Sequence, residues 1–243
     1  MVKKMKTVID KVENPIIRKY KQYLRLEKSV SPNTLDAYLR DLDKFLSYLD
    51  DEGGDFFDVN LDRLHHFIAL LHDEGIHPRS QARIMSGVRS FYRYLLLEDY
   101  IAVDPTALIE SPRLGQHLPD VLTVHEIDSI IESVDMGRTE GQRDRAILEL
   151  LYSCGLRVSE LINLKISNIY TEEKFIQVFG KGSKQRLVPI SETALKEIFQ
   201  YMLDRNLWDI KPGEGDFLFL NQRGSHLSRQ TVFDIIKKAA LNA

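Results

Sequence analysis

The fold is decided by the stretch from Asp144 to Ile190, which reads DRAILELLYSCGLRVSELINLKISNIYTEEKFIQVFGKGSKQRLVPI. Its first part keeps apolar residues at helical spacing as far as Cys154, and Gly155 is the residue type expected just past a helix end. Arg157 follows at once, with Glu160 three residues later. If the chain resumes as a helix there, the carboxylate can hydrogen-bond the guanidinium and orient it. The sequence therefore predicts two helices joined by a turn, with an oriented arginine at the start of the second.

A second cationic feature follows these helices. Segments 174–179 and 184–190 are rich in Val, Ile, Phe and Leu, and between them lies Gly180-Lys181-Gly182-Ser183, a composition typical of a β-hairpin. Taken singly, an Arg–Glu pair near a helix start is most often a solvated ion pair, and a Gly-Lys-Gly segment is most often only a turn. Because the Arg157–Glu160 pair and the Gly-Lys-Gly segment follow each other closely in the sequence, together they indicate a functional site.

Several motifs carry a resemblance to a known family. LYSCGLRVSEL at 151–161 and FGKGSKQRLVP at 179–189 closely resemble the Xer-type tyrosine recombinases of the phage integrase family, which are bacterial site-specific DNA recombinases. The resemblance runs from about Val12 to the end of the sequence, and it includes SPNTLDAY at 31–38 and ARIMSGVR at 82–89. It implies a mainly α fold: an N-terminal helical bundle (a SAM-like core-binding domain) and a truncated α+β catalytic domain with a small antiparallel sheet.

The resemblance also implies a reaction. Tyrosine recombinases cut DNA by attack of a tyrosine hydroxyl on a phosphodiester, which gives a 3′-phosphotyrosyl enzyme and a free 5′-hydroxyl without a metal or another cofactor. Negative charge builds on the non-bridging oxygens of the phosphate, and a guanidinium can stabilise this charge with two hydrogen-bond donors. Arg157 matches the first such arginine, with Glu160 in support. The leaving 5′-oxygen needs a proton, and Lys181 matches the lysine that supplies it.

The family's other catalytic groups are a His-x-x-Arg box, a further His or Trp and the nucleophilic tyrosine, all C-terminal to the segment that matches 228–243. They are absent from this sequence. His226 and Arg229 have the right residue types but precede the last predicted helix, so we reject them as the catalytic pair. Tyr170 and Tyr201 are interpreted as packing residues, which leaves no nucleophile. We expect a truncated recombinase that binds DNA without cleaving it and that exposes apolar surface.

The composition is compatible with this interpretation. The chain has 243 residues, 43% of them hydrophobic, and no apolar run approaches the ~18 residues of a membrane span. We therefore expect a cytoplasmic protein without a membrane contact, and the family resemblance implies that it is nucleoid-associated. Cys154, the single cysteine, is interpreted as a core residue, and it can build neither a disulfide nor a thiol-based metal site alone. A formal net charge of −3 by itself disfavours a polyanionic partner, but this total does not show where the charges lie along the chain.

Positive charge is concentrated in two places. The predicted helix from Ser80 to Glu98 has arginines on the flanks of its apolar face, and the hairpin has no acid among its cations. Such local basic surfaces suit a clamp on DNA, although a solvated basic helix face is the alternative. The candidate DNA contacts are Arg79, Arg83, Arg89, Arg93, Lys184, Arg186 and Arg229; for Arg229 an ordinary solvated face is equally compatible.

Capping residues and prolines divide the chain. Ser31 and Asn60 are expected to cap helices of the first domain, and Thr123 with Glu126 forms a capping box at the start of the second. A proline-rich break in helical periodicity separates them. We predict a core-binding domain over 12–108, a linker over 109–121 and a partial catalytic domain over 122–243.

The resemblance implies several partners, and three alternatives stay open. The expected partners are a double-stranded DNA recombination site, a second recombinase protomer in a homo- or heterotetramer on DNA, and a DNA translocase. Resolution of chromosome dimers is preferred over integration of a mobile element, because no arm-binding domain precedes Val12. The rival classes are a DNA-binding module without chemistry and a helical interaction protein without a nucleic-acid role.

Overall fold

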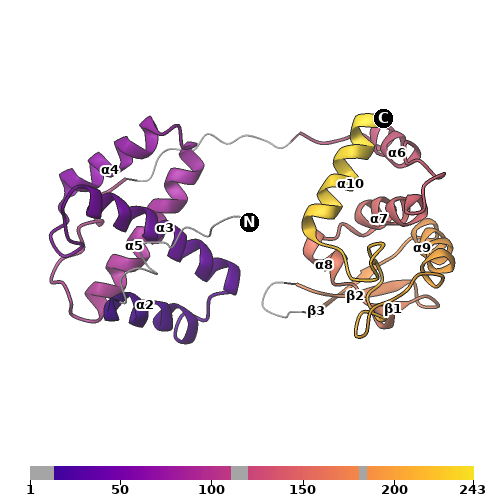
Figure 1. Ribbon diagram of the computed structural model, residues 1–243, viewed down its shortest axis with the longest axis horizontal. Helices are drawn as coiled ribbons and strands as arrows, with labels where there is room; N and C mark the ends of the chain where they lie inside the picture. The colour runs from indigo at the N-terminus through magenta and orange to yellow at the C-terminus, as the bar shows by residue number, and fades with distance from the viewer. Residues whose placement is uncertain (1–13, 111–119, 181–184) are drawn as a thin grey trace. The chain divides into compact units, whose positions relative to one another are not determined.

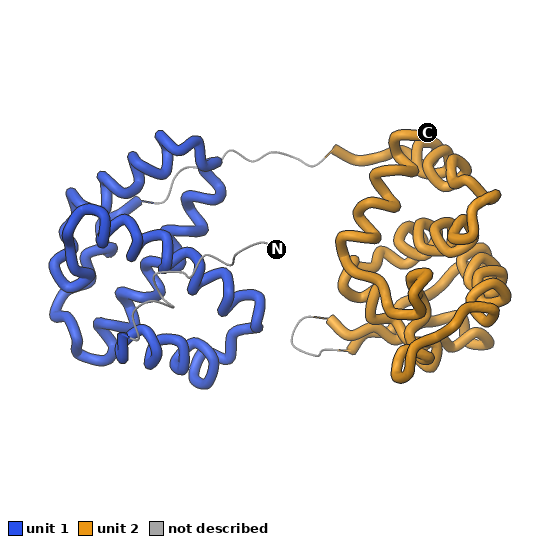
Figure 2. Tube along the Cα trace, in the orientation of Figure 1, with its two compact units in different colours: residues 1–118 blue, residues 119–243 orange. Residues whose placement is uncertain are grey.

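The chain forms two compact units, residues 1–118 and residues 119–243 (Figure 2). The computed structural model describes residues 14–110, 120–180 and 185–243. The division between the units lies within the segment predicted as a linker. Lys181 and Lys184, two of the predicted site residues, lie outside the described residues.

In its described part, the first unit consists of α2 (Pro15–Leu26), α3 (Pro32–Asp51), α4 (Leu61–Asp73) and α5 (Pro78–Leu97) (Figure 1). The predicted caps are present: Ser31 Oγ accepts from the Thr34 backbone at 3.3 Å, and Asn60 Oδ1 from Arg63 at 2.9 Å. α5 begins two residues before the predicted Ser80. Its cap is His77, whose Nδ1 accepts from the Arg79 backbone at 3.2 Å, and the sequence pattern missed it because histidine is not a usual N-cap.

Aromatic residues fill the core of the first unit. Phe45 and Phe67 meet edge to face with ring centroids 5.0 Å apart. The buried Tyr92 donates its hydroxyl to the Phe56 carbonyl at 2.9 Å, so the polar end of this ring is satisfied. Ile109 is also buried in this core. Packing in the first unit therefore extends one residue into the predicted linker.

The second unit surrounds a small sheet with helices (Figure 1). Strands β1 (Ile169–Tyr170), β2 (Phe175–Phe179) and β3 (Gln185–Pro189) pair antiparallel in the order β1-β2-β3. The first helix carries the predicted capping box, in which Glu126 accepts from the Thr123 backbone at 2.7 Å and Thr123 from the Glu126 backbone at 3.3 Å. The remaining elements are α6 (Val124–Glu132), α7 (Gly141–Cys154), α8 (Val158–Ile162), η1 (Ile166–Asn168), α9 (Glu192–Arg205) and α10 (Arg229–Asn242).

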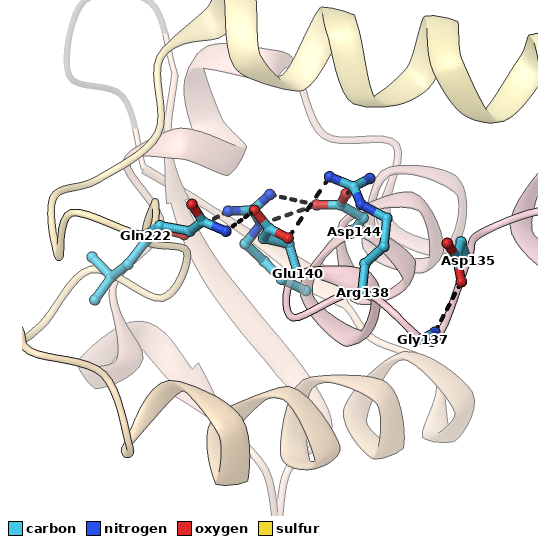
Figure 3. Close-up of polar contacts among 8 residues, drawn as sticks. Asp135, Gly137, Arg138, Glu140, Asp144 and Gln222 are labelled. Atoms are coloured by element: carbon cyan, nitrogen blue, oxygen red, sulfur yellow. Dashed lines mark hydrogen bonds and ion pairs between the residues drawn. The ribbon is translucent and has the colours of Figure 1, made fainter.

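A buried ion pair fixes the start of α7. Arg143 donates to Asp144 Oδ1 through Nε at 3.0 Å and Nη2 at 2.7 Å, and its Nη1 donates to the Leu220 carbonyl at 3.1 Å. Figure 3 shows the surrounding contacts, in which Arg138 forms ion pairs with both Glu140 and Asp144. We call Arg138, Glu140, Arg143, Asp144 and Gln222 the Asp144 cluster. It ties α7 to the segment around Leu220, 77 residues away in the sequence.

The mainly α fold with a small antiparallel sheet is confirmed. The second unit also carries exposed apolar side chains: Phe199 and Leu203 on α9 are 65% and 54% exposed, and Leu241 on α10 is 77% exposed. No helix in the described part of the chain is long and apolar enough to cross a membrane. Nor do the described residues contain a group of His, Cys, Asp or Glu side chains that could hold a metal ion.

Candidate functional site

The site is built on the turn between α7 and α8. Gly155 ends α7 in the left-handed conformation, with φ 55° and ψ 40°, and its N–H donates to the Leu151 carbonyl at 3.1 Å. This conformation strains residues that have a side chain, which is why the helix ends at a glycine. Two residues later Arg157 has extended backbone and forms the N-cap position of α8. The predicted turn between two helices is therefore present, with Arg157 at the start of the second.

Glu160 is the centre of the site. Its side chain is 1% exposed, and its two oxygens accept three hydrogen bonds. Oε1 accepts from Arg157 Nη1 at 3.0 Å. Oε2 accepts from the Arg157 backbone N–H at 2.8 Å and from Arg186 Nη2 at 2.8 Å. We call Arg157, Glu160 and Arg186 the Glu160 cluster. The predicted Arg157–Glu160 hydrogen bond is present, whereas the second arginine on the same carboxylate was not predicted.

These contacts keep the Glu160 carboxyl ionised. Burial by itself raises its pKa, but the hydrogen bonds from the Arg157 backbone and from the Arg186 and Arg157 guanidiniums outweigh burial. The pKa therefore lies below its usual range. One negative charge is held beneath two positive charges, and the cluster carries a net positive charge at neutral pH.

Both guanidiniums reach the surface. The Arg157 side chain is 71% exposed and the Arg186 side chain is 42% exposed, over a carboxylate that solvent does not reach. Within the described residues, the Arg157 guanidinium contacts Glu160, and it does so only through Nη1. Guanidinium donors that face solvent in this way can bind a phosphate or another oxyanion.

The cluster joins two elements that are distant in the sequence. Arg186 belongs to β3, where it is paired with Val178 of β2, so the strand is linked through Glu160 to the start of α8. Cys154, the last residue of α7, contacts the same strand, because its Sγ donates to the Pro189 carbonyl at 3.5 Å. Strand β3 is thus anchored beside Arg157.

The four arginines of α5 differ in what they contact. Arg83 donates to both oxygens of Asp41, at 2.5 and 2.6 Å, and Asp41 is 3% exposed. Arg89 donates to the Ile109 carbonyl. Arg79 and Arg93 are exposed, and Arg93 lines a groove of about 400 Å³ together with Arg89 and Lys28. Arg83 and Arg89 therefore have internal partners, and DNA contact by all four stays a prediction.

The pair Arg83–Asp41 was not predicted, although the sequence contains a signal for it. Asp41 lies three residues after Tyr38 and four before Phe45, which places an acid on the core-facing stripe of α3. A buried carboxylate needs a cationic partner. The residue opposite it is Gly87, where an added Cβ would come within 2.8 Å of the Asp41 Cβ.

The remaining candidates lie elsewhere in the second unit. Arg229 is the exposed first residue of α10. His226 Nδ1 contacts Glu214 at 2.7 Å, and its ring stacks on Phe217. Tyr201 is completely buried and its hydroxyl accepts from the Leu220 backbone at 3.0 Å, so it packs in the core. The ring of Tyr170 stacks on Phe175 with centroids 4.4 Å apart.

Comparisons with known proteins identify the family. Residues 120–243 match the phage integrase family, and residues 17–99 match the phage integrase N-terminal SAM-like domain. Among curated proteins, tyrosine recombinase XerD of Staphylococcus saprophyticus is 39% identical over 230 residues, which cover 94% of this chain and 78% of that protein. XerD of Pseudomonas putida is 39% identical over 229 residues, which cover 94% of this chain and 77% of that protein.

Solved structures show the same fold. The XerH site-specific recombinase bound to a palindromic difH substrate matches with a TM-score of 0.71 and 23% identity, over 92% of this chain and 67% of that one. A lambda integrase dimer bound to a COC′ core site matches with a TM-score of 0.73 and 17% identity, over 95% of this chain and 81% of that one. With both domain models and the XerD relatives in agreement, the chain belongs to the Xer-type tyrosine recombinases of the phage integrase family, enzymes of site-specific DNA recombination.

Proposed function

We propose that Arg157, held by Glu160, is the catalytic arginine and binds the scissile phosphate of a DNA recombination site. The observation that carries this proposal is the exposure pattern: Glu160 is buried and ionised, while the Arg157 guanidinium above it is 71% exposed. An ion pair that exposes both partners contributes little, because solvent screens it. Here the acid is enclosed, and the arginine keeps donors for an external anion.

The chemistry follows from the donors that Arg157 retains. In phosphoryl transfer, negative charge builds on the non-bridging oxygens of the phosphate, and fixed donors aimed at these oxygens lower the barrier. Because Glu160 holds Nη1, the guanidinium plane is fixed before the DNA arrives. Arg157 can then present its other nitrogens to the two oxygens without losing much side-chain entropy at the moment of binding.

Lys181 is proposed as the general acid that protonates the leaving 5′-oxygen. A lysine side chain in water has a pKa of ~10.4, so this residue type carries a proton at neutral pH. Support comes from its place in the chain: it follows β2 by two residues, and β3 on the other side of the hairpin is tied to Glu160 by Arg186. We also assign DNA contact to Arg79, Arg93 and Lys184 and, in the last helix, to Arg229.

A polypeptide of these 243 residues contains no tyrosine after Tyr201, and Tyr201 itself is buried. We therefore propose that this polypeptide binds a half-site duplex without cleaving it. Incubation with a nicked DNA substrate that traps covalent intermediates tests this. A protein–DNA adduct would contradict the proposal and would place a nucleophile within these residues.

Duplex binding tests the role of Arg157. In a salt titration we expect Arg157→Ala to lower the affinity about tenfold and to reduce the slope of log affinity against log salt by about one, as for the loss of one phosphate contact. Lys174→Ala is the matched control, because it removes a cation from the same hairpin that pairs with Glu192 instead. If both variants lose the same affinity for the duplex, the loss is explained by net charge alone, and a specific role of Arg157 is contradicted.

For the cellular role we propose resolution of chromosome dimers at a chromosomal recombination site. The curated relatives named XerD are 38–40% identical to this chain and cover 94–95% of it, which supports this role. The proposed partners are a second recombinase protomer on the DNA and a DNA translocase, in the cytoplasm at the nucleoid. Footprinting on chromosomal and mobile-element sites tests this choice, and protection of only the mobile-element site would contradict it.

A further inference from the structure

Arg186 occupies an inward-facing position of strand β3. It lies opposite Val178 in the β2–β3 ladder and two residues before Val188, and both valines are buried. Paired residues, and residues two apart on a strand, share one face of a sheet. Arg186 therefore leaves the sheet from its inner face, whereas the adjacent Leu187 is 63% exposed.

The inward start of this side chain is explained by its partner. Arg186 Nη2 donates to Glu160 Oε2 at 2.8 Å, the oxygen that also accepts the Arg157 backbone N–H. The Arg157 guanidinium, by contrast, uses only Oε1. The two guanidiniums thus contact different oxygens of the same carboxylate.

This arrangement determines how many donors Arg157 keeps. A carboxylate normally takes an arginine in a two-bond fork, one bond to each oxygen. With Oε2 occupied by Arg186, the Arg157 guanidinium makes one bond instead of two. Without Arg186, the second oxygen could draw in another nitrogen of Arg157, and that nitrogen would be lost to an external phosphate.

We propose that Arg186 is a positioning residue that acts through Glu160: it occupies Oε2, prevents a two-bond Arg157–Glu160 fork, and so preserves the Arg157 donors for the DNA phosphate. This inference rests on the proposed role of Arg157 and deepens it. It replaces the expectation that Arg186 serves the site by touching DNA itself.

A double-mutant cycle on duplex binding separates the two roles. The variants are Arg186→Ala, Glu160→Gln and the double variant in the 243-residue chain, with a fluorescent duplex of arbitrary sequence as the ligand. We expect Arg186→Ala to weaken binding about tenfold in the wild-type background, comparable with loss of one charge-assisted hydrogen bond, and less than about twofold in the Glu160→Gln background. Arg186→Lys, which keeps a donor and the charge, should recover most of the affinity.

Equal losses for Arg186→Ala in both backgrounds would overturn the proposal, because a direct phosphate contact does not depend on Glu160. No loss in the wild-type background would also overturn it. Lys174→Ala serves again as the charge-matched control and should change the affinity less than about twofold, as expected for a cation away from the site.

A second measurement keeps the inference testable if Glu160→Gln does not fold, and separates it from the role of Arg157. The Glu160 carboxyl carbon can be titrated by NMR in the wild type and in Arg186→Ala. A higher midpoint in the variant supports the Arg186–Glu160 link even where Arg157→Ala leaves DNA binding unchanged, a result that would contradict only the proposed function. An unchanged midpoint would overturn the inference whatever Arg157 does.

Discussion

Two arginine–carboxylate clusters in the second unit use the same chemical groups and bury them differently. In the Asp144 cluster both members of the central pair are enclosed, with side-chain exposures of 6% for Arg143 and 9% for Asp144. In the Glu160 cluster the acid is enclosed and the arginines are exposed. The three guanidinium nitrogens of Arg143 all have protein partners, whereas the Arg157 guanidinium uses one. Within this unit, the enclosed arginine has its donors taken up by protein groups, whereas the exposed one keeps donors that a ligand can use.

The matched substitutions Arg143→Ala and Arg157→Ala should give the largest contrast. Arg143→Ala leaves the Asp144 carboxylate buried without its partner, and we expect the free energy of unfolding to fall by about 3–5 kcal/mol. Arg157→Ala leaves Glu160 with two donors and should lower it by less than about 1 kcal/mol. Urea denaturation measures both values. Similar losses would show that the exposure difference does not separate the two arginines.

The pair Arg83–Asp41 in the first unit extends the comparison, since it also joins a buried acid to an exposed arginine. We expect Arg83→Ala to lower the free energy of unfolding by about 1–3 kcal/mol, because Asp41 loses two charge-assisted hydrogen bonds. The exposed Arg93→Ala on the same helix should stay within about 0.5 kcal/mol.

Because Arg83 pairs with the buried Asp41, it is a poor position at which to test DNA contact by α5. Arg83→Glu would place a second carboxylate beside buried Asp41, so its loss of binding could reflect unfolding. The pair Arg79→Glu and Arg93→Glu is the cleaner choice. If these exposed variants bind duplex with unchanged affinity and salt slope, the α5 surface is not a DNA contact.

The Glu160 and Asp144 carboxyls should have opposite effects on stability as the pH changes. The pKa of Glu160 is lowered in the folded state, so its stabilising contribution is present above the unfolded pKa of ~4.3 and is lost as pH falls through the folded pKa. For Asp144, burial raises the pKa despite the bond from Arg143. Its ionisation therefore weakens folding as pH rises from the unfolded pKa of ~3.9 through the folded pKa. Carboxyl NMR should show the Glu160 midpoint below its ordinary value and the Asp144 midpoint above it; the reverse order would contradict the burial argument.

The smallest effect is expected at an ion pair that is exposed on both sides. Lys174 contacts Glu192 at 2.5 Å, with side-chain exposures of 54% and 80%. We expect Lys174→Ala to leave the thermal midpoint unchanged within error, because solvent screens the pair. A clear drop would mean that pairs without an enclosed member also support this unit.

Local sequence patterns predicted much of the framework. Ser31, Asn60 and the Thr123–Glu126 box cap the helices as expected, and Gly155 ends α7 where its residue type predicted. Arg157 and Glu160 are three residues apart, so their contact depends on a single helical turn. Apart from the His77 cap, the features that were missed are long-range: Arg83 reaches an acid 42 residues away, and Arg143 a carbonyl 77 residues away.

The sequence by itself determined the family, the two-helix turn with its oriented arginine, and the hairpin that follows. These depend on backbone preferences and side-chain contacts within a few residues, which residue order specifies directly. Only the tertiary structure decided that Arg186 turns inward and shares Glu160 with Arg157. That outcome requires the register of β2 and β3 and the approach of β3 to Glu160 of α8, and both are contacts between segments that are separated in the sequence.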